Sequence, residues 1–364
     1  PIGTVLVRRT ASLGELEPRA QANFGAAVMC AIAFGATIGG MGSPIGTAPN
    51  ALFFTNYEEL VDRGARPVSF LLWILAFAPF ALLLSFCASQ VIARFALPMP
   101  GRRLVRGDEL LQEARALPAW CSGERRTAAL FVCAVILWMT RGDLPMGDGD
   151  VFHGWAHYLV PEGERDRFLA DGSVAVLIAI LAFLIPSGDA PGRRLCDWET
   201  ARQMPFDLLL LLGGGIAMAQ AFGPTGLSAA FGELLRPLIG SMHPVMLMLC
   251  LILAVSFLSE VASNTAVATL SLPIVREGAI AAGIEPLVLM LPVVIGASCS
   301  FMLPISTPPN TIVFASRQIS FGQMARAGIG LNLLSAAVLL PVLWFWALPL
   351  CGVDTSALVQ GGAK

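Results

Sequence analysis

GATIGGMGSPIGTAPN occupies residues 35–50, and a related stretch, GASCSFMLPISTPPN, occupies residues 296–310. Each copy follows an apolar run, is rich in small residues and proline, and ends in Thr-x-Pro-Asn before a further apolar run. Glycine and proline interrupt helices, whereas serine, threonine and asparagine supply neutral hydrogen-bonding groups. Each copy therefore predicts a helix that is broken in its middle, one over 24–54 and the other over 286–315.

The composition places these segments in a membrane. Of 364 residues, 56% are hydrophobic and only 13% are charged, with a mean hydropathy of +0.73. A soluble domain carries about 25% charged residues, so this chain could not cover a soluble core of its size. The formal net charge of −2 gives no support to a phosphate-rich partner. These values exclude a cytosolic enzyme, a disordered protein and a nucleic-acid binder, and they indicate an all-α polytopic membrane protein.

The other long apolar runs divide the chain, because a helix that spans a bilayer needs about 20 mainly apolar residues. We expect residues 1–97 to be the remainder of a first repeat, 98–126 a cytoplasmic interfacial linker, 127–350 a second repeat and 351–364 a tail. The further helices that we expect lie at 68–97, 127–140, 173–187, 206–222 and 328–350, with a re-entrant hairpin at about 244–275.

Paired broken helices in the two halves of a hydrophobic chain point to the binding site of a secondary transporter. An orientation with the arginines at 8–19 on the cytoplasmic side keeps most basic residues inside, as the positive-inside rule requires. In that orientation the first broken helix runs outward and the second inward, so we expect an inverted repeat. A break exposes unpaired N–H and C=O groups to a cavity, where they can bind an anion and a small cation.

Three adjacent polar residues, Ser263-Asn264-Thr265, lie between two apolar stretches, as expected at the tip of a re-entrant hairpin. Ser263 and Asn264 are also favourable caps for the helix that follows. The tripeptide by itself is common, and its ordinary role is a cap or a turn. Its functional weight comes from its combination with the two Thr-x-Pro-Asn copies.

This combination resembles the divalent anion:sodium symporter family. Ser-Asn-Thr followed by Ser-Thr-Pro-Pro-Asn (306–310) is similar to the second hairpin and second broken helix of that family, and residues 38–50 resemble its first broken helix. The stretch from Trp198 to Gly215 is similar to the segment before the second hairpin. The resemblance implies an inverted-repeat transporter that takes up a divalent anion with Na⁺, a C4-dicarboxylate such as succinate, by an elevator-type movement. It also implies a homodimer in the plasma (inner) membrane, with no organic cofactor and no resident metal other than the transported sodium.

The resemblance also assigns residues to the site. The substrate would contact Ser263, Asn264, Thr265, Thr307, Pro308 and Thr47. Sodium would be bound by Gly46, Asn50, Ser263, Asn264, Ser306 and Thr307. No Arg or Lys falls in these motifs, so the anion would be held by amides, hydroxyls and bound Na⁺, and binding of the cations would prepare the site for it.

The chain departs from the family pattern near its start and at the first break. Pro1-Ile2-Gly3 resembles the position that follows a hairpin tip by about ten residues, so we expect a first Ser-Asn-Thr hairpin to be missing upstream of it. Ala48 stands where the family more often has proline, and Ser43 where it often has threonine.

Other functions are compatible with the same pattern. A truncated homologue could act as an anion sensor or interaction protein without transport, and a sulfate or proton-coupled anion permease could share the architecture. We do not expect an enzyme, because no pair of acidic, His or Cys side chains stands at a spacing suited to acid–base or nucleophilic chemistry. Glu260, in an apolar segment, is either a functional group or a support that ties the hairpin arms by hydrogen bonds, and we favour the support.

Overall fold

The computed structural model describes residues 18–61, 64–98, 119–142, 144–147, 150–161, 169, 171–189, 192–202, 242–356 and 358, with isolated positions between 210 and 241. Most of the helix expected at 206–222 and most of the linker expected at 98–126 lie outside the described residues. The chain forms two compact units. The first comprises residues 1–68, 72–104 and 209–364, and the second comprises 69–71 and 105–208.

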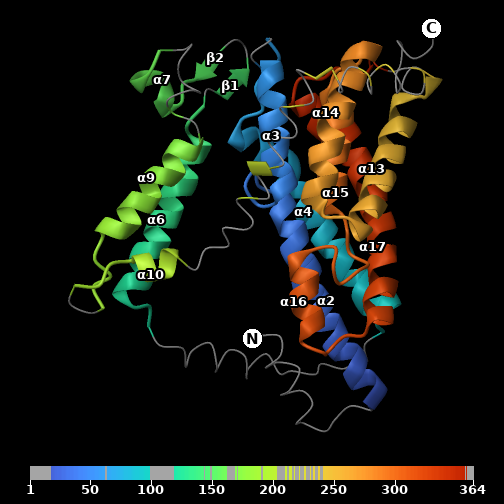
Figure 1. Cartoon of the computed structure of the whole chain (residues 1–364), viewed down its shortest axis with the longest axis horizontal. Helices are drawn as coiled ribbons and strands as arrows, with labels where there is room; N and C mark the ends of the chain where they lie inside the picture. Colours follow the sequence, from blue (N-terminus) through green and yellow to red (C-terminus); the bar gives the residue numbers. More distant parts are fainter. Residues whose placement is uncertain are drawn as a thin grey trace. The chain divides into compact units, whose positions relative to one another are not determined.

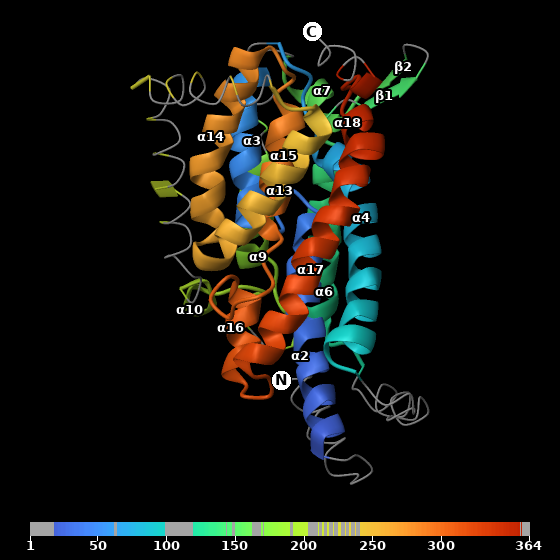
Figure 2. The same ribbon diagram turned by 90° about the vertical axis from the view of Figure 1, so that its right-hand side faces the viewer.

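The first unit contains the two interrupted helices (Figures 1 and 2). The first consists of α2 (Pro18–Met41) and α3 (Ala48–Val61), and the second of α15 (Leu287–Ser298) and α16 (Pro308–Ala315). Both figures show the two interrupted helices running in opposite directions, and α16 packs against α2 while α15 packs against α3. The breaks predicted from Thr-x-Pro-Asn are therefore present, and they lie beside each other.

A helical hairpin packs against this pair. Its arms are α13 (Pro244–Val261) and α14 (Asn264–Ala282), which only Ala262 and Ser263 separate. Figure 2 shows the two arms descending to and rising from a shared tip, beside α15. The second arm ends at Ala282, beyond the expected limit near 275, because the helix continues through Pro273. Both arms contact α15, so the hairpin tip is held next to the second break.

Two further helical segments belong to the described part of the first unit. One is α4 (Phe70–Val91), continued by the π-helix η1 (Ile92–Ala96); the other is α17 (Phe321–Val342), continued by η3 (Leu343–Ala347) and α18 (Leu348–Leu350). The core lies around α15, all of whose residues are buried. Such a helix, apolar on every side, belongs at the centre of a bundle. The ring of Phe34 in α2 meets that of Phe301 in the second break, with centroids 5.3 Å apart.

By length and composition alone, five of the described helical segments can cross a membrane. They are Ala20–Met41, Phe70–Ala96, Pro244–Val261, Asn264–Ala282 and Phe321–Leu350. Several contain an interior proline, which membrane helices tolerate because neighbouring groups satisfy the freed backbone. The last segment begins at Phe321, earlier than the expected 328, because Ser320 and Gln323 form a capping box there.

Among its described residues, the second unit contains a pair of helices, α6 (Ser122–Met139) and α9 (Asp171–Leu184), and the short helices α7 (Trp155–Leu159) and α10 (Trp198–Ala201). A two-stranded antiparallel ribbon, β1 (Leu144–Gly147) and β2 (Asp150–Phe152), lies between α6 and α7 in sequence. The all-α expectation missed this ribbon, since its strands are too short to carry an alternating pattern. Much of α6 and α9 is apolar and exposed, including Phe131, Ile136 and Leu184.

Candidate functional site

The first break is closed by close backbone packing and by one asparagine. A Cβ on Gly46 would collide with the backbone carbonyl of Gly40, so a residue without a side chain is needed there. The Asn50 side-chain nitrogen donates to the Ser43 carbonyl at 2.8 Å and to the Gly40 carbonyl at 3.3 Å. Asn50 is fully buried, and within the described part of the chain its Oδ1 has no hydrogen-bond partner.

The second break is closed in the same way. Asn310, the last residue of the second motif, donates from its side-chain nitrogen to the Leu303 carbonyl and to Ser306 Oγ, both at 3.1 Å. Thr307 Oγ1 accepts from the Asn310 backbone N–H at 3.3 Å and so caps α16. As at Asn50, Asn310 Oδ1 is buried without a partner among the described residues. The two motifs therefore form equivalent loops, each with one unused buried carbonyl oxygen.

The hairpin tip reaches the second break through Asn264. Its Oδ1 accepts from Ser300 Oγ at 2.9 Å, while Thr265, the next residue, is buried. Ser263 occupies the N-cap position of α14 but is exposed and makes no side-chain cap bond to the described residues. The expected cap is thus wrong for the Ser263 side chain. The backbone N–H groups in the first turn of α14 can therefore donate hydrogen bonds to an anion.

A side-chain contact joins the two breaks. Ser298 Oγ donates to Thr47 Oγ1 at 3.3 Å, and Cys299 Sγ lies 4.0 Å from Met41 Sδ just beside it. The Asn264–Ser300 contact links the hairpin tip to the second break, and the Ser298–Thr47 bond links the second break to the first. Pro308 is exposed at the start of α16 and takes no part in these side-chain contacts.

The site offers amides, hydroxyls and backbone groups, and its motifs contain no charged side chain. Such neutral oxygens suit a hard monovalent cation, and helix N-termini suit an anion. Among the residues that the structure describes, no three His, Cys, Asp or Glu form a metal-binding group. Sequence reasoning missed Ser298 and Ser300, although both lie inside the quoted second motif, because nothing in one sequence shows which serine of a break faces a neighbour.

We expect Ser300→Ala to weaken sodium and anion binding by roughly 2- to 10-fold, because one hydrogen bond of about 0.5–1.5 kcal/mol that orients Asn264 is lost. Titration of the purified protein, followed by tryptophan fluorescence or heat release, measures this change. Ser298→Ala removes a hydroxyl from the same break that contacts Thr47 and not Asn264. Weaker binding in Ser298→Ala but unchanged binding in Ser300→Ala would contradict a specific role of Ser300 at the hairpin tip.

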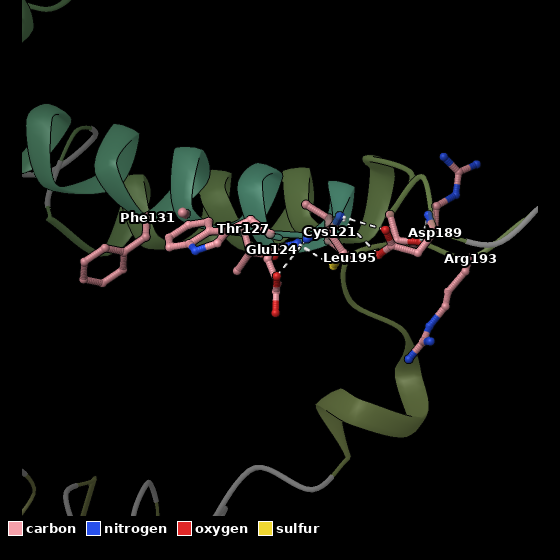
Figure 3. Close-up of a pocket in the computed structure, with 12 residues that line it drawn as sticks. Cys121, Glu124, Thr127, Phe131, Asp189, Arg193 and Leu195 are labelled. Atoms are coloured by element: carbon pink, nitrogen blue, oxygen red, sulfur yellow. Dashed lines mark hydrogen bonds between the residues drawn. The ribbon is translucent and has the colours of Figure 1, made fainter. Parts of the chain in front are cut away.

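A separate cavity of about 870 Å³ lies in the second unit, at the start of α6 (Figure 3). Its lining includes Glu124, Asp189 and Arg193, and none of the predicted site residues. The Asp189 carboxylate accepts from the Gly123 backbone N–H at 3.1 Å, as the dashed lines in Figure 3 show. The N-terminal end of α6, where a helix can bind an anion, is therefore already occupied by the Asp189 carboxylate. This cavity is for that reason a weaker candidate for the anion site than the breaks are.

The arrangement of two opposed helix breaks and a hairpin tip defines a membrane transporter core. Residues 5–353 match the family model described as the sodium:sulfate symporter transmembrane region. The chain belongs to this family of multi-pass membrane transporters, which is not a family of enzymes, and the resemblance inferred from the motifs is confirmed.

Named relatives agree with this family. The chain is 33% identical over 360 residues to a sodium-dependent dicarboxylate transporter, SdcS, of Staphylococcus saprophyticus; the match covers 98% of this chain and 66% of that protein. It is also 33% identical over 358 residues to the protein of the same name from Staphylococcus aureus, covering 97% of this chain and 65% of the relative. The chain thus spans just under two thirds of the length of these relatives.

Proposed function

We propose that the chain is the core of a sodium-coupled symporter for a divalent anion, a C4-dicarboxylate such as succinate. The observation that carries the proposal is the chain of contacts from Asn264 to Ser300 and from Ser298 to Thr47, which brings the hairpin tip and both breaks into one neutral, hydrogen-bonding site. The names of the relatives support the choice of a dicarboxylate.

Within this proposal the anion contacts Ser263, Asn264, Thr265, Thr307, Pro308 and Thr47. The first break binds one sodium with Gly46 and Asn50, whose buried Oδ1 is an unused acceptor. The second sodium is bound by Ser263 and Asn264 from the hairpin and by Ser306 and Thr307 from the second break. The bound sodium ions then neutralise much of the charge of the dianion. Binding of sodium therefore favours binding of the dianion, and binding of the dianion favours binding of sodium.

We also propose that the two interrupted helices are the matching parts of an inverted repeat and that the hairpin is re-entrant. Their opposite directions and the equivalent roles of Asn50 and Asn310 support this reading. All these parts belong to the first unit, whereas α6 and α9 belong to the second. That division supports an elevator movement of one unit against the other, with the exposed apolar faces of α6 and α9 toward lipid or the second subunit of a homodimer.

Ligand-induced stabilisation tests this function on the purified protein in detergent. We expect Na⁺ and succinate together to raise the melting temperature by several degrees, because a ligand at 100 times its Kd adds about 2.7 kcal/mol. Succinate with K⁺ in place of Na⁺ should have little effect. Sulfate and citrate, each with and without Na⁺, identify the preferred anion.

Stabilisation that is the same in Na⁺ and K⁺ would contradict sodium coupling. If lowering the pH in the absence of Na⁺ gave the same stabilisation by the anion as Na⁺ does, that result would favour a proton-coupled permease. Sodium-dependent stabilisation without any transport by the full product of the gene would favour an anion sensor.

A further inference from the structure

A buried carboxylate lies at the end of the first hairpin arm, next to the tip. Glu260 is 4% exposed and is the penultimate residue of α13. Its Oε1 accepts from the backbone N–H groups of Phe301 at 2.7 Å and Met302 at 2.9 Å, and its Oε2 accepts from those of Met302 at 3.0 Å and Leu303 at 2.9 Å. Asn332 of α17 adds a fifth contact, from Nδ2 to Oε1 at 2.7 Å.

These contacts replace the helical hydrogen bonds that the second break lacks. Because α15 ends at Ser298 and α16 begins at Pro308, the N–H groups of 301–303 have no place in a regular helix. Unpaired N–H groups are costly in a buried setting, and a carboxylate that accepts several of them forms strong, charge-assisted hydrogen bonds. Asn332 Oδ1 also accepts from the Phe301 N–H, at 3.2 Å. The unwound backbone is thus fixed from two sides, by the hairpin and by α17.

Glu260 and Asn264 hold the break at adjacent points. Glu260 ends the first arm four residues before Asn264, which begins the second arm on the other side of the tip. Asn264 accepts from Ser300, the residue just before the anchored segment. The hairpin tip and the second break therefore cannot shift independently. The oxygens proposed to bind the second sodium come from both sides of this junction, since Asn264 is on the hairpin and Ser306 is on the break.

We propose that Glu260 is the positioning residue for the second cation site: its carboxylate holds the hairpin tip and the second break in the single geometry in which oxygens from both can bind one Na⁺. Its negative charge, buried beside the site, adds an electrostatic attraction for the cation. This inference rests on the proposed function. Glu260 itself contacts neither the ion nor the anion.

The test compares Glu260→Gln with wild type. Glutamine has the same shape but replaces one acceptor oxygen by an NH₂ group, which opposes backbone N–H donors. We expect the Na⁺ concentration for half-maximal stabilisation by succinate, or for half-maximal uptake, to rise at least tenfold. The succinate concentration for half-maximal stabilisation or uptake, measured at saturating Na⁺, should change less than threefold. At high Na⁺ the maximal stabilisation or uptake should return to the wild-type value.

Glu59→Gln is the matched control, because Glu59 is a half-exposed carboxylate that pairs with Arg276 in the same unit, away from the hairpin tip. It should leave the Na⁺ dependence unchanged. If Glu260→Gln does not fold, Asn332→Ala removes one donor to the same carboxylate, and we expect a smaller rise in the Na⁺ requirement.

Three outcomes separate the possibilities. An increased Na⁺ requirement with retained succinate binding at high Na⁺ supports the proposal. A lower melting temperature with an unchanged Na⁺ requirement, in Glu260→Gln or in Asn332→Ala, would overturn it, since that is the result of a purely structural role. Absence of any Na⁺ effect on wild type would instead refute the proposed function.

Discussion

Replacing Gly328 by alanine is expected to lower the melting temperature of the protein markedly. Gly328 lies on the face of α17 that touches the second break, and a Cβ there would overlap the Met302 Cα and the Phe301 carbonyl. Both obstacles are backbone atoms that Glu260 and Asn332 hold in place, so they cannot move away as a side chain could. We expect a loss of about 1–3 kcal/mol, as for overpacked cores, measured by thermal unfolding in detergent.

Gly330→Ala is the matched control for this prediction. Gly330 lies on the same helix, and a Cβ there meets Val91 Cγ1 at 3.6 Å, an ordinary contact. Because alanine favours a helix over glycine by up to about 1 kcal/mol, this variant should be as stable as wild type or more stable. Equal stability of the two alanine variants would show that α17 does not pack against the break as described.

Asn264→Ala is expected to remove sodium-driven uptake almost completely. The substitution removes the amide that Ser300 orients and that we propose binds both the anion and the second sodium. Loss of one such polar contact costs about 1–3 kcal/mol, and loss of contacts to two ligands at once should reduce uptake by at least tenfold. Uptake of labelled succinate into proteoliposomes at fixed Na⁺ measures the effect.

Asn23→Ala controls for a general effect of removing an asparagine. The Asn23 side chain donates to the Pro98 carbonyl at an exposed position, at the start of the first interrupted helix. This variant should transport like wild type. Retained uptake by Asn264→Ala would contradict the placement of the site at the hairpin tip.

The breaks were predictable because their cause is local. Glycine, proline and the terminal asparagine lie within one short stretch, and the structure shows Gly46 in close backbone contact and Asn50 bonded to carbonyls of its own loop. The same local chemistry recurs at Asn310. The sequence pattern therefore predicted the positions of the breaks, whereas the hydrogen bonds by which Asn50 and Asn310 close them came from the structure.

The contacts between segments could not be predicted in this way. The sequence favoured hydrogen bonding as the role of Glu260 but suggested the other hairpin arm as its partner; the structure gives the hydrogen bonds and places them on residues 301–303 and on Asn332. These partners are distant in the sequence, and no periodicity connects them. Arg276 is a similar case, because this buried arginine of α14 pairs with Glu59 of α3 at 2.7 Å.

Sodium-driven uptake of succinate by the full product of the gene, reconstituted in proteoliposomes, tests the central claim most directly. Vesicles with an inward Na⁺ gradient should accumulate labelled succinate, whereas an equal K⁺ gradient or a pH gradient without Na⁺ should not drive accumulation. Accumulation driven by protons alone, or no accumulation of succinate, sulfate or citrate in any gradient, would contradict a sodium-coupled symporter of divalent anions.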